Sequence, residues 1–236
     1  MIGLLSAAGP SPAAAAPLVL REGLDGYAGT ADASVFEGAA YENNSAGALI
    51  YLIVGRTNQN FTRRGLVRFD LSALPSDAVV TDATLRLVVD RSGMSEAQDF
   101  TLHRATRAWG EGSVNPVSDP GQGAPAAAGD ATWLSAAHQQ QAWTTPGGDY
   151  VATASATANG AGPGTETVFS GAGLLADIEA WRADPAANHG WVVRGDEAQR
   201  RSAKRFYTSE AASDATDRPT LTLQLAEPAP SGWTLY

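Results

Sequence analysis

The chain has 236 residues, a formal net charge of −9, and an apolar share of 44%. This composition can supply the core of one large domain, while the acidic balance argues against a nucleic-acid partner, which requires a basic face. The absence of cysteine excludes disulfides and thiolate metal sites. No apolar run reaches the roughly 20 residues that a transmembrane helix needs.

The two ends of the chain differ in composition from the region between them. Residues 1–16 are rich in Ala and Pro and predict a tail or the remnant of a secretion signal, with small residues of the cleavage-site type at 13–16. Residues 17–226 predict one β-sandwich domain. Residues 227–236 predict a Pro-rich C-terminal tail.

Strand patterns fill the first half of the predicted domain. Short strands are expected at 17–21 and 33–37, and the almost uniformly apolar residues 48–55 predict a strand that is buried on both faces. Residues 63–70 and 83–90 alternate between apolar and polar side chains, which is typical of strands with one buried face. The alternation continues in a further strand at 100–105.

The second half contains a long loop, one helix and the closing strands. Residues 107–150 are rich in Trp, Gly and Pro, and a loop of this length is uncommon in a compact domain unless it is functional. Residues 173–184 predict a short helix that caps one end of the sandwich, because its apolar residues recur at helical spacing before Pro185. The remaining predicted strands are at 150–158, 165–170, 188–195, 204–208 and 220–226.

Four strings, in order along residues 17–225, resemble segments of the DNRLRE-type domains. They are LREGLDGYAGTADASV, GLVRFDLSALPSDAVVTDATLRLVV, GDATWLSAAHQQQAWTTPGGDY and RFYTSEAASDATDRPTLTL. The resemblance implies an all-β fold, an antiparallel jelly-roll-like β-sandwich of bacterial or archaeal secreted and surface proteins. Some members of that family are classed as carbohydrate-binding modules, and the family implies no enzyme class of its own.

Aromatic and basic residues suggest a surface that binds polysaccharide. Sugar rings stack on Trp faces, and Arg side chains bind acidic groups in bidentate fashion, so a Trp surface with an Arg stripe would suit an acidic polysaccharide. The alternative is that the Trp side chains pin the long loop to the sandwich. The candidate ligand-binding residues are Trp109, Trp133, Trp143, Arg63, Arg68 and Arg86.

Carboxylates at loops and strand ends are candidates for a structural calcium ion, which prefers six to eight oxygen ligands. The four candidates are Asp25, Asp32, Asp214 and Asp217. The alternative is that these carboxylates accept hydrogen bonds from turn N–H groups, a role that we also expect for Asp70. Arg205 and Glu210 predict an ion pair that fastens adjoining loops.

These observations favour a non-catalytic, extracellular or cell-surface module that binds a polysaccharide or matrix glycan, or that acts as an adhesive. The alternative is a structural subunit of a surface filament, a homopolymer assembled by β-strand exchange through a terminal segment. A polysaccharide-degrading enzyme is the weakest hypothesis, because the chain has no G-x-S-x-G, H-E-x-x-H or phosphate-loop motif. Glycoside cleavage uses a pair of carboxylates at a suitable separation, and only the fold determines that separation.

Overall fold

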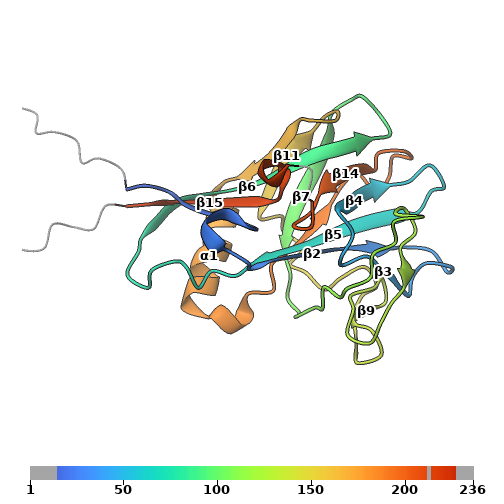
Figure 1. Cartoon of the computed structure of the whole chain (residues 1–236), viewed down its shortest axis with the longest axis horizontal. Coiled ribbons are helices and arrows are strands. Elements are labelled where there is room, and N and C mark those ends of the chain that lie inside the picture. Colours follow the sequence, from blue (N-terminus) through green and yellow to red (C-terminus); the bar gives the residue numbers. More distant parts are fainter. Residues whose placement is uncertain (1–14, 212–213, 227–236) are drawn as a thin grey trace, which may run out of the picture.

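The structure is a computed structural model that describes residues 15–211 and 214–226. Within these residues the chain folds into one large antiparallel sheet, which curls so that two halves pack face to face (Figure 1). The predicted all-β sandwich with one short helix is confirmed. No helix of the described residues has the length and apolar character that crossing a membrane requires.

The strands of one half are β1 (Leu18–Arg21), β4 (Tyr51–Arg56), β6 (Val80–Ser92), β12 (Glu166–Ser170), β14 (Lys204–Tyr207) and β15 (Thr220–Leu225). This half is organised around β6, which pairs with β15 and then β14 along its length, and with β12 on its other edge. β1 extends the sheet beyond β15, and β4 extends it beyond β14. Every pairing in this half is antiparallel.

The strands of the other half are β2 (Thr30–Phe36), β5 (Thr62–Phe69), β7 (Gln98–Arg104), β11 (Ala156–Gly160) and β13 (Trp191–Arg194). Their order across the sheet is β2, β5, β13, β7 and β11. The β4–β5 hairpin joins the two halves, with Gly55 paired to Arg63.

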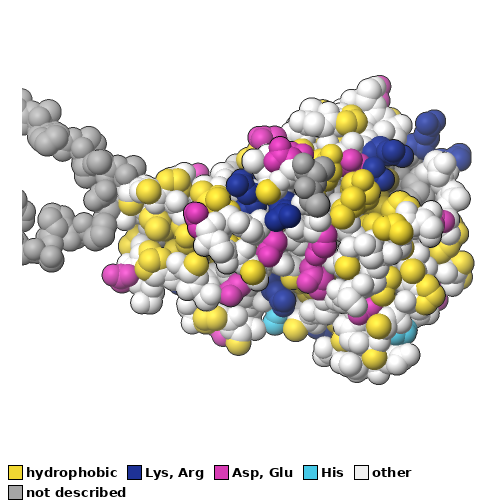
Figure 2. All heavy atoms as spheres, viewed as in Figure 1, with side chains coloured by type: hydrophobic (Ala, Val, Ile, Leu, Met, Phe, Trp, Pro, Cys, Tyr) yellow, Lys and Arg dark blue, Asp and Glu magenta, His cyan; other side chains and the backbone are white. Residues whose placement is uncertain are grey.

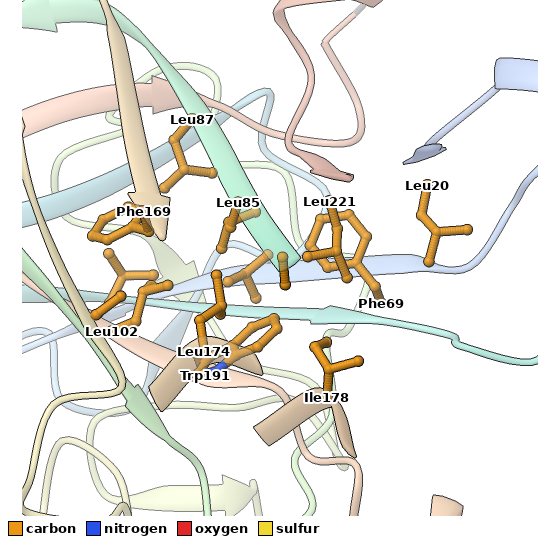
Figure 3. Packing of buried hydrophobic residues seen from close by; sticks show 14 of the residues in the cluster. Leu20, Phe69, Leu85, Leu87, Leu102, Phe169, Leu174, Ile178, Trp191 and Leu221 are labelled. Carbon is orange, nitrogen blue, oxygen red and sulfur yellow. The ribbon is translucent and has the colours of Figure 1, made fainter. Parts of the chain in front are cut away.

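The core lies between the two halves and follows from the alternation in their strands. In β6, the side chains of Leu85, Leu87 and Val89 are fully buried, as their spacing predicts. The one α-helix of the described residues, α1 (Ala172–Ala183), closes the core at one end, because Leu174 and Ile178 point into it. Figure 3 shows these helix residues among side chains from several strands.

Two tryptophans attach α1 to the sheet. The ring of Trp181 from α1 packs edge to face against the ring of Trp191 from β13, with centroids 4.6 Å apart. The indole N–H of Trp191 donates to Oδ2 of Asp177 at 2.9 Å, so the polar edge of this buried ring is satisfied. The helix predicted at 173–184 is therefore confirmed within one residue at each end.

The first described strand completes the sheet of its own chain. β1 pairs with β15, with Leu18 opposite Leu223. Leu18–Arg21 therefore pairs within its own chain, and the strand-exchanged filament stays a prediction. Residues 1–14 and 227–236, which hold the rest of the predicted tails, lie outside the described residues.

The long loop lies across the outer face of the half that contains β2, β5 and β13. It carries short strands at β8 (Ala124–Pro125), β9 (Ser135–Ala137) and β10 (Gln141–Ala142), and β8 pairs with β3 (Asn44–Ser45). Its side chains form a second hydrophobic cluster with residues of the sheet, including Leu66 of β5. The loop is therefore an ordered outer layer of the sandwich.

Candidate functional site

All three predicted tryptophans lie in the second hydrophobic cluster. Trp109, Trp133 and Trp143 are only 5%, 9% and 5% exposed. The indole N–H of Trp109 donates to the backbone oxygen of His189 at 2.8 Å, and that of Trp143 donates to Thr132 at 2.9 Å. Protein covers the faces that a sugar ring would need. The predicted stacking surface is thus corrected to an anchor for the long loop, as the alternative interpretation expected.

Two of the predicted arginines are committed to structural contacts. Arg63 is fully buried, and its guanidinium donates to the backbone oxygens of Glu37 at 2.8 Å and Gly121 at 2.9 Å. Burial lowers the pKa of Arg63 to about 10. Arg86 pairs with Glu166 at 3.0 Å and donates to the backbone oxygen of Thr216. The predicted arginine stripe is therefore not formed by these two residues.

Arg68 differs from the other predicted arginines. Its guanidinium lies 5.5 Å from the ring centroid of Trp109, which brings two of the predicted residues together. Within residues 15–211 and 214–226, this guanidinium has no hydrogen bond or ion pair. It lines a polar groove of about 450 Å³. The groove is also lined by Gly29 and by the polar residues Thr30, Asp70, Glu111 and Asn188.

Local backbone and turn chemistry build one wall of the groove. Gly29 approaches Asp70 so closely that a Cβ at this glycine would lie 2.7 Å from the Cβ of Asp70. Asp70 accepts hydrogen bonds from the backbone N–H and the hydroxyl of Ser72, both at 2.9 Å, which confirms its predicted turn role. The side-chain amide of Asn188 donates to the backbone oxygen of Phe69 at 2.8 Å.

A second hollow of about 280 Å³ adjoins the polar groove and shares Asp70, Pro185 and Asn188 with it. Its further lining includes Leu71, Leu74 and Trp181, so this section is more apolar. Together the two hollows offer hydrogen-bonding groups beside apolar surface. This combination is what pockets for small polar ligands share.

Glu111 is the second acidic residue of the groove besides Asp70, and it reaches the groove from the long loop. One of its carboxylate oxygens accepts from the backbone N–H of Asp32 at 2.7 Å. Burial and the charge of Glu210 raise the pKa of Glu111 to about 7, and Arg68 opposes that rise. A Cβ at Gly47 would lie 1.7 Å from the backbone oxygen of Glu111, so this close approach requires glycine.

The four aspartates predicted as calcium ligands do not come together. Asp25 and Asp214 are exposed, and Asp214 accepts from the backbone N–H of Thr216 at 2.7 Å, which is a turn role. Asp217 lies in the same short 3-10 turn, whereas Asp32 is buried in β2. Among the residues that the structure describes, no group of three or more His, Asp or Glu side chains is arranged to hold a metal.

The predicted pair of Arg205 and Glu210 is corrected. Arg205 instead pairs with Asp90 of β6, and its guanidinium lies 3.6 Å from the ring centroid of Tyr51. Glu210 accepts a hydrogen bond from the hydroxyl of Ser209 at 3.1 Å.

In Figure 2, acidic side chains gather near the middle of the viewed face, with basic side chains beside them.

The comparisons with known proteins give one family. A family model described as carbohydrate-binding module family 96 matches residues 26–159, which is more than half of the chain. The matched region includes β2, β5, β6, β7 and the long loop, and thus both Arg68 and Glu111. No curated protein matches the chain. The match supports the carbohydrate-binding part of the resemblance, and the DNRLRE-type label stays a prediction.

Proposed function

Because the chain belongs to carbohydrate-binding module family 96, we propose that it binds a polysaccharide without cleaving it, through the groove lined by Arg68 and Glu111. The observation that carries this location is the unpaired guanidinium of Arg68. An arginine has five N–H donors, and here all of them are available within the described part of the chain. The guanidinium lies over the ring of Trp109, a cation–π contact that favours this position of the arginine.

The groove offers donors and acceptors that suit sugar hydroxyls. Arg68 supplies donors, while the free oxygen lone pairs of Glu111 supply acceptors. The adjoining hollow, with Leu71 and Leu74, offers apolar surface for the C–H face of a second sugar unit.

A binding role fits the carboxylates of the groove better than a cleaving role. Glycoside cleavage generally uses a pair of carboxyl groups that flank the scissile bond. Here the two carboxylate oxygens of Asp70 are both engaged by Ser72. Of the two groove carboxylates, Glu111 is then the one available to a ligand. One available carboxylate suits recognition of the glycan better than its hydrolysis, which generally uses two.

Replacing Arg68 with alanine tests the proposed groove. A glycan array identifies the ligand, and isothermal titration calorimetry then measures its Kd with the wild-type chain and with Arg68→Ala. We expect binding by the variant to be at least ~10-fold weaker. A tenfold change in Kd corresponds to about 1.4 kcal/mol, which is a modest loss when hydrogen bonds from a charged group are removed. Arg68→Lys keeps the charge without the planar fork and is expected to bind with intermediate affinity.

The matched control is Arg91→Ala, which removes an exposed arginine of β6. This variant should bind like the wild type. Thermal melts of all variants separate lost binding from lost folding. If Arg68→Ala binds the array ligand with wild-type affinity while remaining folded, the glycan lies elsewhere on the domain.

We also infer that the module works outside the cell or at the cell surface of a bacterium or archaeon, where polysaccharides of a matrix are found. An adhesive role would follow from binding such a matrix. Fractionation of the source cells, with antibody detection of the native chain, should recover it in the medium or the surface fraction. Recovery in the cytosolic fraction alone would contradict this location.

A further inference from the structure

Asp32 is a buried carboxylate whose bonding is incomplete. It lies on β2 and is 1% exposed. Its Oδ2 accepts from the backbone N–H of Ser209 at 2.9 Å, while Oδ1 has no partner in the described residues. Buried charges in proteins are normally paired or bound to a metal ion, because leaving them unpaired is costly.

Other oxygen atoms without partners surround Asp32. Glu210 follows Ser209 directly in the chain, and its Oε2 is also buried without a partner in residues 15–211 and 214–226. Thr30 lies two residues before Asp32 on the same face of β2, and its hydroxyl oxygen is likewise unpartnered. Glu111 contacts the backbone N–H of Asp32. The unpartnered oxygens of Asp32 and Glu210 thus lie in one buried region, where the charge of Glu210 acts on Asp32.

The charges of these carboxylates are poorly compensated. Burial, followed by the charges of Glu210 and Glu111, raises the pKa of Asp32, and burial also raises the pKa of Glu210. Glu22 adds a further negative charge near Glu111 and Glu210. The basic residues nearby are Arg68, which faces Glu111, and Arg218, which donates instead to the backbone oxygens of Ala211 and Glu22.

We propose that a calcium ion binds between Asp32 and Glu210, with the hydroxyl of Thr30 and water molecules completing its coordination and Glu111 close by. The donor set is all oxygen, which suits a hard cation, and calcium accepts six to eight oxygens in flexible geometry. The site uses two carboxylates, since no set of three or more His, Asp or Glu side chains among the described residues is arranged to hold a metal. The proposal does not rest on glycan binding.

The direct test is calcium binding by the intact chain. Protein freed of metal with a chelator is titrated with calcium chloride by calorimetry, and its melting temperature is measured with and without the ion. We expect one ion per chain and a Tm rise of at least ~5 °C when calcium is at 100 times its Kd. No heat of binding and no Tm shift at millimolar calcium would overturn the proposal. An equal shift with magnesium would overturn the choice of calcium.

Two matched variants locate the ion. Asp32→Asn preserves the shape of the side chain and removes its charge, so it should abolish the calcium-induced Tm shift. Without calcium, this variant should melt at or above the wild-type temperature, because a poorly compensated buried charge is gone. Asp214→Asn changes an exposed aspartate of the predicted quartet and should respond like the wild type. A wild-type calcium response in Asp32→Asn would place the ion elsewhere.

Discussion

Replacing Trp143 with alanine is expected to lower the free energy of unfolding by about 3–5 kcal/mol, the usual range for deleting a buried aromatic side chain. Trp143 is 5% exposed in the cluster that fixes the long loop to the sheet. The change also leaves the backbone oxygen of Thr132 without its indole donor. Urea denaturation followed by far-UV circular dichroism measures the loss without relying on tryptophan fluorescence.

Two other variants separate packing from surface effects. Trp143→Phe retains most of the buried area and should lose clearly less stability than the alanine variant. Val117→Ala changes a residue of the same loop that is 74% exposed, and it should leave stability within about 0.5 kcal/mol of the wild type. If Trp143→Ala were as stable as the wild type but lost glycan binding, Trp143 would be a stacking residue after all.

Glu197→Gln is expected to destabilise the domain by about 2–3 kcal/mol, somewhat less than for a fully buried ion pair because Glu197 is partly exposed. The carboxylate of Glu197 accepts from Arg64 at 2.7 and 3.0 Å and from Arg194 at 3.1 and 2.7 Å. A glutamine would present an N–H group to guanidinium donors and leave two positive charges without their anion. Denaturation by urea at neutral pH measures the difference.

The same carboxylate predicts how the domain responds to acid. Burial opposes ionisation of Glu197, but hydrogen bonds from Arg194 and Arg64 outweigh it and lower the pKa to about 2. The folded pKa lies below the ordinary value of 4.5, so this stabilisation is present above pH 4.5 and is lost as pH falls toward 2. The wild type should therefore lose more stability than Glu197→Gln between pH 5 and pH 2.5.

The control for this prediction is Glu166→Gln, at the surface pair with Arg86. The side chain of Glu166 is 57% exposed, so its loss should change the unfolding free energy by less than about 1 kcal/mol. Equal losses in the Glu166 and Glu197 variants would mean that the paired guanidiniums around Glu197 contribute no more than a surface contact does.

Local periodicity was sufficient to predict the main elements of the fold. The alternation at 83–90 lies inside β6, and the helical spacing of Leu174, Ile178 and Trp181 matches α1. These signals depend on neighbours within a few residues, so the printed sequence carries them directly. The sandwich class followed from them, because successive strands with one apolar face must bury that face against a partner.

The burial of the three tryptophans in the long loop depends on β2, a strand that lies far from them in the sequence. The loop rests on a face of β2 where small residues, Ala31 and Ala33, leave room for large rings. The alternation in β2 indicates a strand, but it does not indicate that a loop about 75 positions later will cover it. The sequence therefore left two interpretations of the tryptophans open, a sugar-binding surface and an anchor for the loop, and the burial of the three rings favours the anchor.

The proposed calcium site shows the same limit more strongly. Ser209, which bonds to Asp32, is 177 positions away from it in the chain. Glu210 and Glu111 carry no motif that distinguishes them from other surface carboxylates. Of the predicted calcium quartet only Asp32 belongs to this cluster, because register and sheet topology, which the residue pattern alone does not determine, decide which carboxylates meet.

The pairing of β1 with β15 determines how the domain would yield to mechanical force. Leu18, where β1 begins, lies opposite Leu223 near the end of β15, so both ends of the described domain emerge at the same edge. A pull that separates these ends loads the hydrogen bonds of the pair one after another, as in opening a zip, instead of all at once. In a module tethered through both ends, the pairing of Leu18 with Leu223 would therefore be among the first to bear the load.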